Sequence, residues 1–234
     1  MTYEEVLAAL DNCYFDELTN DNCEDNIIYN IPMEVDWDKG ASKLAIFFPN
    51  TDFVVKIPFS GYFDEDEYDD DYWDFEHAEN DSEIDEPDLA DYYYSFEGAC
   101  DQGDGSDYCR AEELCYELAT EYGVEQLFAK TECIGKVNGY PIYAQPICES
   151  FSFSNNSLDN SKEEIALTLS KCKENDFYSF NDEWLTDVLK YYGDEIFNNL
   201  CHFIDTENIR DLHNGNIGYR NGAPILFDYS GYES

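Results

Sequence analysis

The sequence predicts an α+β fold with a strand-rich first half and a helical second half. Short apolar runs separated by turn residues recur through residues 1–148, whereas helical periodicity prevails in residues 162–234. Between them, residues 149–161 are rich in serine and asparagine and predict a linker. Hydrophobic residues make up 43% of the chain and aromatic residues 17%, which is enough apolar material to bury a core.

The first half should open with a helix and continue with a hairpin. Residues 2–20 place apolar side chains among acids in a helical pattern, and Thr2 followed by Glu5 matches a capping box. Lys43–Phe48 and Phe53–Ile57 are β-like runs on either side of a Pro-Asn-Thr-Asp sequence. That composition is typical of a turn, so the two runs predict an antiparallel pair.

A long helix and a second hairpin should follow. The helix begins near Tyr108, repeats apolar residues at helical spacing and stops at Gly123. Phe128–Ile134 and Tyr140–Ile147 then flank Asn138-Gly139, a dipeptide that favours a tight hairpin turn.

The second half should contain two helices and a final apolar run. The helices cover roughly residues 162–174 and 182–204. A loop at 209–218 should then lead to the apolar run Ala223–Phe227.

The charge of the chain excludes several functions. There are 12 lysines and arginines against 54 aspartates and glutamates, which gives a formal net charge of −42. We therefore expect neither direct nucleic-acid binding, which needs a basic surface, nor docking on an anionic membrane. No run of about 18 apolar residues could span a bilayer, and the acidic N-terminus has no secretory signal. Nine cysteines without a C-x-x-C pair predict reduced, mostly buried thiols in a cytoplasmic protein.

Acidic residues are concentrated in residues 64–107. Sixteen of the 28 residues from Asp64 to Asp91 are aspartate or glutamate, with tyrosines and a tryptophan among them. One interpretation is a solvated loop. The other is mimicry of a nucleic-acid backbone, since 16 carboxylates match roughly 27 Å of duplex. The segment would then bind a basic nucleic-acid-binding host protein, such as a restriction or CRISPR nuclease, as phage-encoded inhibitors do.

Two polar motifs near the end of the chain point to phosphoryl transfer. Asp211 precedes Asn216 by five residues, and Asp228-Tyr-Ser-Gly follows twelve residues after Asn216. This pattern resembles the catalytic loop and the metal-binding Asp-Phe-Gly segment of the protein-kinase-like superfamily. The tripeptide Asp-Leu-His that begins at Asp211 looks most like the catalytic loop of small-molecule kinases such as the aminoglycoside phosphotransferases. The resemblance implies that Asp211 is the base and that Asn216 and Asp228 hold Mg²⁺ against the phosphates of ATP.

The first half supplies the remaining residues that the resemblance requires. Lys56, within Phe53–Ile57, resembles the strand-three lysine that positions ATP. Glu112 lies on the packed side of the following helix and would pair with this lysine. The usual glycine-rich phosphate loop is reduced to Gly40-Ala-Ser-Lys43, so Gly40 and Lys43 are candidate phosphate contacts; the alternative interpretation of Lys43 is an ordinary surface lysine.

The resemblance implies a two-lobed protein-kinase-like fold with a strand-rich N-lobe (1–148, with the acidic insertion 64–107), a linker (149–161) and a truncated helical C-lobe (162–234). Only six residues follow Asp228, so the segments that dock peptide substrates are not expected. This leaves a minimal kinase, an ATP-binding pseudokinase, or a scaffold reused for binding, in each case of phage origin. The alternative function is non-enzymatic inhibition of a host defence protein by the acidic insertion.

Overall fold

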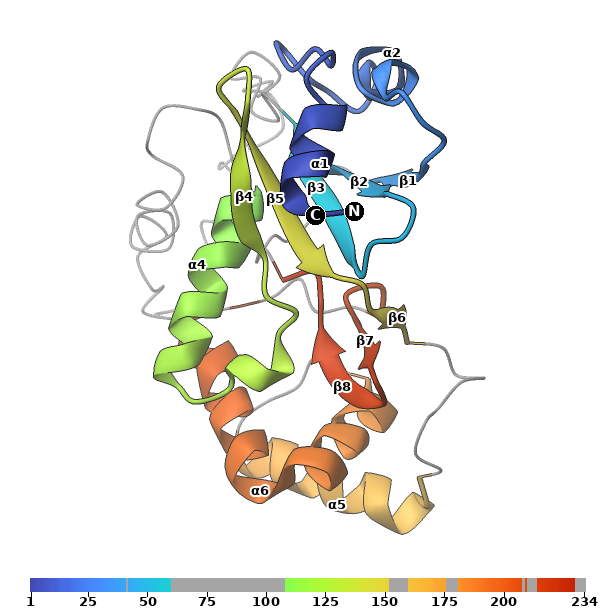
Figure 1. Ribbon diagram of the computed structural model, residues 1–234. Coiled ribbons are helices and arrows are strands. Elements are labelled where there is room, and N and C mark those ends of the chain that lie inside the picture. Colours follow the sequence, from blue (N-terminus) through green and yellow to red (C-terminus); the bar gives the residue numbers. More distant parts are fainter. Residues whose placement is uncertain are drawn as a thin grey trace, which may run out of the picture.

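A computed structural model shows two antiparallel sheets, with helices packed beside the larger sheet and further helices beyond the smaller one (Figure 1). It describes residues 1–40, 42–59, 108–151, 160–175, 181–207, 209 and 214–229. Within these residues the fold is a mixture of helices and antiparallel strands, as the sequence predicts.

The larger sheet has five strands in the order β1-β2-β3-β5-β4, and every neighbouring pair is antiparallel. Its strands are β1 (Asp36–Lys39), β2 (Lys43–Phe47), β3 (Phe53–Pro58), β4 (Glu132–Val137) and β5 (Tyr140–Pro146). Both predicted hairpins are confirmed, because β2 pairs with β3 and β4 pairs with β5. Strand β1 was not predicted.

The second hairpin turns at the predicted dipeptide. Asn138 and Gly139 have φ angles of 53° and 87°, the left-handed conformation that a two-residue hairpin turn requires. The preceding strand starts at Glu132, later than the predicted Phe128, because Phe128 and Ala129 pair instead with Leu226 of the small sheet through an isolated parallel bridge.

The N-terminal segment covers one face of this sheet with short helices. Helix α1 (Tyr3–Ala9) starts at the predicted capping box of Thr2 and Glu5, but it stops well short of residue 20. Its early end has a packing reason. Cys13 and Phe15 are both buried, although residues two positions apart lie on different faces of a continuous helix. Helices α2 (Cys23–Asn26) and η1 (Ile28–Asn30) complete the cover.

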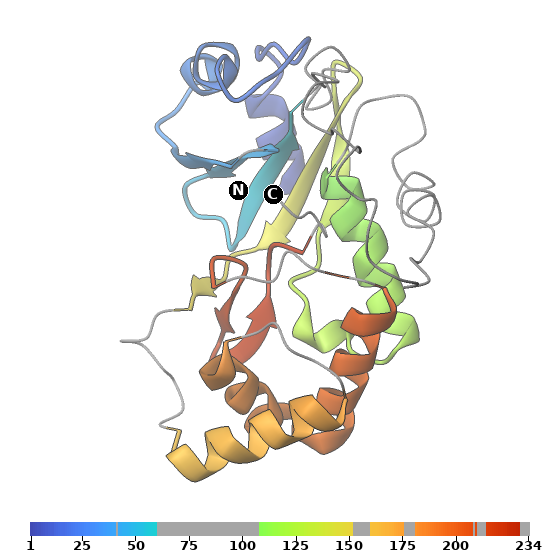
Figure 2. The same cartoon turned by 180° about the vertical axis from the view of Figure 1, so that it is seen from behind.

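Helix α4 (Tyr108–Glu121) is the predicted long helix and runs from the large sheet toward the other half of the molecule (Figure 1). Beyond it lie α5 (Lys162–Glu174) and α6 (Asp182–Thr206), at the end of the molecule opposite α1 and α2 (Figure 2). The helix pair predicted in this half is therefore confirmed.

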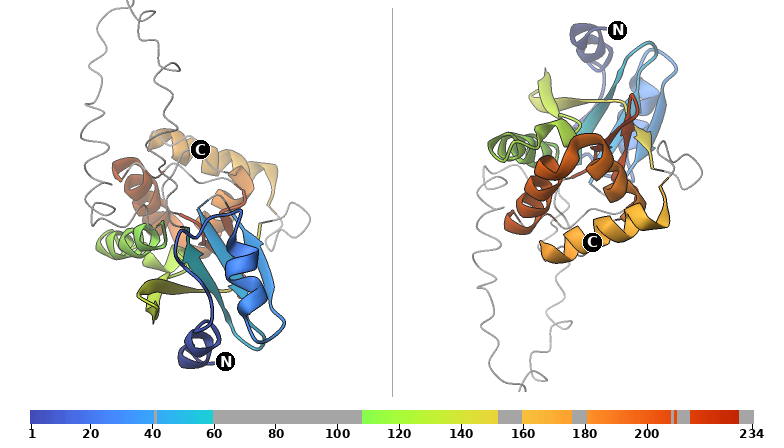
Figure 3. Two further views of the ribbon diagram at one scale, coloured as in Figure 1. Left: turned by 90° about the horizontal axis from the view of Figure 1, so that it is seen from above. Right: turned by 90° about the horizontal axis from the view of Figure 1, so that it is seen from below.

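Helix α6 is broken at Gly193, whose φ of 83° and ψ of 176° interrupt the helix (Figure 3). The arm before the break carries Trp184, whose Nε1–H donates to the carbonyl oxygen of Gly218 at 3.1 Å. The arm after it carries Phe203, whose ring makes edge-to-face contacts with the rings of Tyr122 and Phe128, at centroid distances of 5.0 and 5.5 Å.

A small second sheet has the order β6-β7-β8 and consists of β6 (Glu149–Ser150), β7 (Ile217–Arg220) and β8 (Ala223–Leu226). Strand β6 lies inside the predicted linker. The predicted loop at 209–218 is wrong over its last two residues, because Ile217 and Gly218 belong to β7. The sequence carries a signal for this hairpin, since Asn221-Gly222 forms its turn and both residues have positive φ.

The described residues contain two hydrophobic cores. One lies between the N-terminal helices and one face of the large sheet, and includes Leu10, Leu44 and Ile142. The other is built from α4, α5, α6, β7 and β8, and includes Trp184 and Phe203. Helix α4 belongs to the second core through Cys115 and Ala119, while its first turns reach the large sheet. Between the two cores lies a group of charged side chains.

Candidate functional site

Four charged residues from four different parts of the chain meet between the two cores, and we call them the ionic cluster. They are Lys43 on β2, Lys56 on β3, Glu112 on α4 and Asp228, just after β8. All four were singled out in the sequence as candidate site residues. Their formal charges are two positive and two negative, so the cluster is electrically balanced.

Lys56 and Glu112 form the ion pair that the sequence predicted. The Nζ atom of Lys56 lies 2.9 Å from Oε1 and 2.8 Å from Oε2 of Glu112. It also donates to the carbonyl oxygen of Phe227 at 3.0 Å, so its three N–H groups all have acceptors. The pair therefore ties the sheet to α4, and the lysine reaches the chain next to Asp228.

Glu112 is completely buried and is the centre of the cluster. Besides both lysines, its carboxylate accepts hydrogen bonds from the hydroxyl of Thr131 and, at 3.4 Å, from Nε2 of Gln145. Gln145 in turn donates to Oγ1 of Thr131 at 2.8 Å. A buried carboxylate is tolerable only when such partners replace its lost water, and here both oxygens have them.

Lys43 bridges the two carboxylates. Its Nζ atom lies 2.7 Å from Oε1 of Glu112 and 2.7 Å from Oδ1 of Asp228. The side chain is only 8% exposed, so the interpretation of Lys43 as a surface lysine is wrong. Burial lowers the pKa of Lys43, but the carboxylates of Glu112 and Asp228 outweigh burial and raise that pKa above its ordinary value.

Asp228 is the member of the cluster with the most solvent contact, its side chain being 32% exposed. Burial of the rest of the carboxyl group raises its pKa, yet the ammonium groups of Lys43 and Lys56 outweigh that effect. Together they bring the pKa of Asp228 down to about 2. This carboxylate is therefore ionised at neutral pH and is partly accessible to solvent.

Strand alternation explains why these side chains share one face of the sheet. Lys56 pairs with Ala45, two residues from Lys43, and side chains two positions apart lie on the same face. Gln145 pairs with Val54, two residues from Lys56, so Gln145 lies on that face as well. The residues in between, such as Leu44, Val55 and Ile57, point into the first hydrophobic core on the other side. The polar face is the one that α4 covers.

Asn216 lies beside Asp228 through the backbone. Its carbonyl oxygen accepts from the backbone N–H of Phe227 at 3.0 Å and from that of Asp228 at 3.5 Å, and the residue is buried. This link brings the two predicted metal ligands close in the fold. Asp211, the predicted base, lies outside the described residues, so its position relative to Asp228 stays a prediction.

Gly40 is in the turn that precedes β2 and is not part of the ionic cluster. It is exposed, its N–H donates to the carbonyl oxygen of Lys43 at 3.0 Å, and its own carbonyl accepts from Nδ2 of Asn20 at 2.7 Å. Its role as a phosphate contact stays a prediction.

Sequence reasoning missed Thr131 and Gln145, the polar neighbours of Glu112. Gln145 did give a signal, because it is a lone amide inside the apolar run Tyr140–Ile147, and a polar residue within a buried strand needs a partner. Thr131 gave none, since threonine is common in strands for reasons of packing.

The described residues contain no cluster of carboxylates, thiols or imidazoles around the predicted metal ligands. Among them, no three His, Cys, Asp or Glu side chains are grouped so as to hold a metal ion. Asp228, the predicted carboxylate ligand, already has one oxygen on the ammonium group of Lys43. Mg²⁺ prefers an octahedral shell of oxygens and is repelled by cations close to its ligands. In the described residues the predicted carboxylate ligand is thus engaged by a lysine, and Mg²⁺ binding at Asn216 and Asp228 stays a prediction.

None of the helices that the structure describes is both long and apolar enough to cross a membrane. The acidic segment, residues 64–107, lies outside the described residues, so the predicted contact with a basic partner stays a prediction.

Comparison with known proteins gives no relative: no protein-family description, no curated protein and no solved structure matches this chain.

Proposed function

We propose that this chain is a kinase-like protein that binds ATP at the ionic cluster, with Lys56 contacting the phosphates. The observation that carries the proposal is the buried Lys56–Glu112 ion pair, with an ionised Asp228 beside it. In kinases a lysine on the third strand is held by a glutamate from the next helix and contacts the nucleotide phosphates. Here Lys56 is on the third strand of the sheet and Glu112 is on the long helix that follows.

The hydrogen bonds of Lys56 support a role in anion binding. Two of its acceptors are the oxygens of Glu112, which fix the direction of the side chain. The third is the uncharged carbonyl of Phe227. A phosphate oxygen is a stronger acceptor for an ammonium group than a neutral carbonyl, so a phosphate could replace this third partner without breaking the ion pair.

Phosphoryl transfer needs more than binding. An acceptor hydroxyl must be oriented by a carboxylate, and the resemblance assigns this task to Asp211. The proposal therefore separates into two steps that respond to different substitutions. Asp211→Asn should leave ATP binding intact and abolish any transfer, whereas changes in the cluster should remove binding itself.

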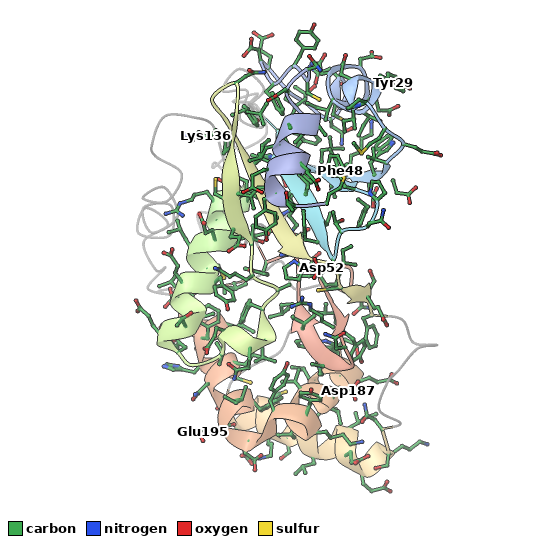
Figure 4. All side chains as sticks on the ribbon, viewed as in Figure 1. Tyr29, Phe48, Asp52, Lys136, Asp187 and Glu195 are labelled. Carbon is green, nitrogen blue, oxygen red and sulfur yellow. The ribbon has the colours of Figure 1, made fainter. Side chains whose placement is uncertain are left out.

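Thermal unfolding of the full chain with ATP tests the binding step. ATP at 100 times its dissociation constant stabilises a protein by about 2.7 kcal/mol, which raises Tm measurably. We expect this shift in wild type and its loss in Lys56→Met and Asp228→Ala. Lys136→Met is the matched control, because Lys136 is an exposed lysine of the same sheet near the far tip of β4 (Figure 4).

The outcomes are separable. A stabilisation by ATP that Lys136→Met retains and Lys56→Met loses supports the proposal, provided that the circular dichroism spectrum of Lys56→Met is that of wild type. If Lys56→Met does not fold, Lys56→Arg keeps the charge and provides the second variant. The absence of any shift at millimolar ATP, with Mg²⁺ or with EDTA, would overturn the proposal.

A further inference from the structure

Lys43 neutralises negative charge at both carboxylates of the ionic cluster. This side chain comes from β2, a strand that carries no other member of the cluster, and its ammonium group reaches both carboxylates at 2.7 Å. Nearly all of its length is buried. A lysine held this firmly between two carboxylates is a fixed part of the site.

The ion pairs of Lys43 with Glu112 and Asp228 affect whether the cluster can accept a cation. Lys43 and Lys56 already neutralise Glu112 and Asp228 in formal terms, so the cluster needs no added cation to be stable. A divalent ion on the carboxylate of Asp228 would have to share that group with Lys43, and the ammonium group of Lys56 contacts the carbonyl oxygen of the preceding residue, Phe227, at 3.0 Å. Both ammonium groups would repel the ion, and repulsion grows where water is excluded.

We propose that Lys43 takes the place of a divalent cation at Asp228, so that the chain binds a nucleoside triphosphate without Mg²⁺. The inference rests on the proposed function, since it describes how the same site accepts its ligand. Lys43 and Lys56 together present two ammonium groups to the phosphates. Asp228 serves to hold Lys43 in place and is not a metal ligand.

Calorimetric titration with ATP tests this inference on the full chain, once in excess EDTA and once in excess MgCl₂. Wild type should bind ATP in EDTA with a dissociation constant within about threefold of that in MgCl₂. Lys43→Gln frees the carboxylate of Asp228 and removes one ammonium group. Its affinity in EDTA should fall at least about tenfold, and MgCl₂ should restore much of the loss.

Two other variants keep the test decisive. Lys43→Arg keeps a cation on Asp228 and should bind ATP in EDTA, which guards against a Lys43→Gln chain that does not fold. Lys39→Gln is the matched control, because Lys39 is on the neighbouring strand β1 and its ammonium group contacts the partly exposed Glu24 and the carbonyl oxygen of Asn20, away from the ionic cluster. It should bind ATP as wild type does under both conditions.

The results distinguish this inference from the proposed function. ATP binding by wild type that requires MgCl₂ would overturn the role given to Lys43 and leave the proposed function standing. ATP binding in EDTA that Lys43→Gln retains in full would likewise overturn it. Failure to bind ATP under either condition would overturn the proposed function, and this inference with it.

Discussion

Nζ of Lys43 lies 2.7 Å from Oδ1 of Asp228, although 185 residues separate the two in the chain. This contact joins a strand of the large sheet to the segment after the small sheet. Glu112 holds the same ammonium group from α4, so three parts of the fold meet at one nitrogen atom.

Glu112→Gln should destabilise the protein strongly. The substitution leaves the ammonium groups of Lys43 and Lys56 buried with only one carboxylate between them, and breaking a buried ion pair from one side typically costs about 3–5 kcal/mol. Urea unfolding followed by circular dichroism measures the change. Glu117→Gln makes the same chemical change on the exposed side of α4 and should alter stability by less than about 0.5 kcal/mol. Equal effects of the two substitutions would contradict the role given to the cluster.

Acid should weaken the contribution of Asp228 to the free energy of unfolding over a defined range of pH. The pKa of this carboxyl is lowered from 3.8 to about 2 in the folded chain, so the folded state favours its ionised form. Its contribution is therefore complete above about pH 4 and is lost as the pH falls through about 2. This pKa shift corresponds to at most about 2.5 kcal/mol of folding free energy. The actual contribution is smaller, because the carboxylate has some contact with water.

Asp228→Asn measures this contribution when unfolding free energies are compared at several pH values between 6 and 2. The variant should be less stable than wild type at pH 6, and the difference should shrink toward pH 2. Asp36→Asn, at an exposed position on β1, removes the same charge and corrects for general repulsion among the acids. A difference that stays constant across this range would show that the Asp228 carboxyl is not held in its ionised form by the lysines.

Gly218→Ala should loosen the small sheet. A Cβ atom at this position would lie 2.0 Å from the carbonyl oxygen of Glu149 on β6, so the strands would have to move apart. Overpacking of this kind costs typically about 1–3 kcal/mol. Gly40→Ala is the control, because its nearest neighbour would be an ordinary 3.9 Å away. A drop in Tm for Gly218→Ala alone is the expected result, and equal values of Tm would show that β6 does not pack on β7 as described.

The cysteines should differ sharply in reactivity. Cys133 is exposed, whereas burial raises the pKa of Cys13 to about 11 and that of Cys201 to about 12. At pH 8 such buried thiols are ionised in only about one molecule in a thousand or fewer, so they react slowly even when reached. A thiol reagent applied to a Cys100→Ser background should label Cys133 first. The fast phase should vanish in a Cys100→Ser chain that also carries Cys133→Ser, and its persistence would mean that a buried cysteine or the partly buried Cys148 reacts as fast as Cys133.

Local patterns predicted most of the secondary structure. The two hairpins and helix α4 were evident because turn composition, alternation and helical periodicity are properties of short segments. Glu112 could be selected because it lies three residues before Cys115 and seven before Ala119, on the packed side of the helix. Strand β7 was missed because its sequence has little apolar character of its own, and only the Asn-Gly turn after it indicated a hairpin.

The role of Lys43 could not be predicted in the same way. Alternation does place Lys43 and Lys56 on one face of the hairpin, so the register could have paired them. Whether that face meets solvent or another part of the chain depends on where α4 and Asp228 lie, and neither is encoded near Lys43. The same limit applied to Thr131, whose hydroxyl meets Glu112 only after the sheet and the helix have packed.

The break at Gly193 gives α6 two directions, and each arm contacts a different neighbour. The first arm holds β7 through Trp184, while the second packs against the end of α4 through Phe203. Tyr192, at the bend itself, donates to the carbonyl oxygen of Pro224 on β8 at 3.0 Å. The angle of the bend therefore sets the distance between the strand pair β7–β8, which leads directly into Asp228, and helix α4, which carries Glu112.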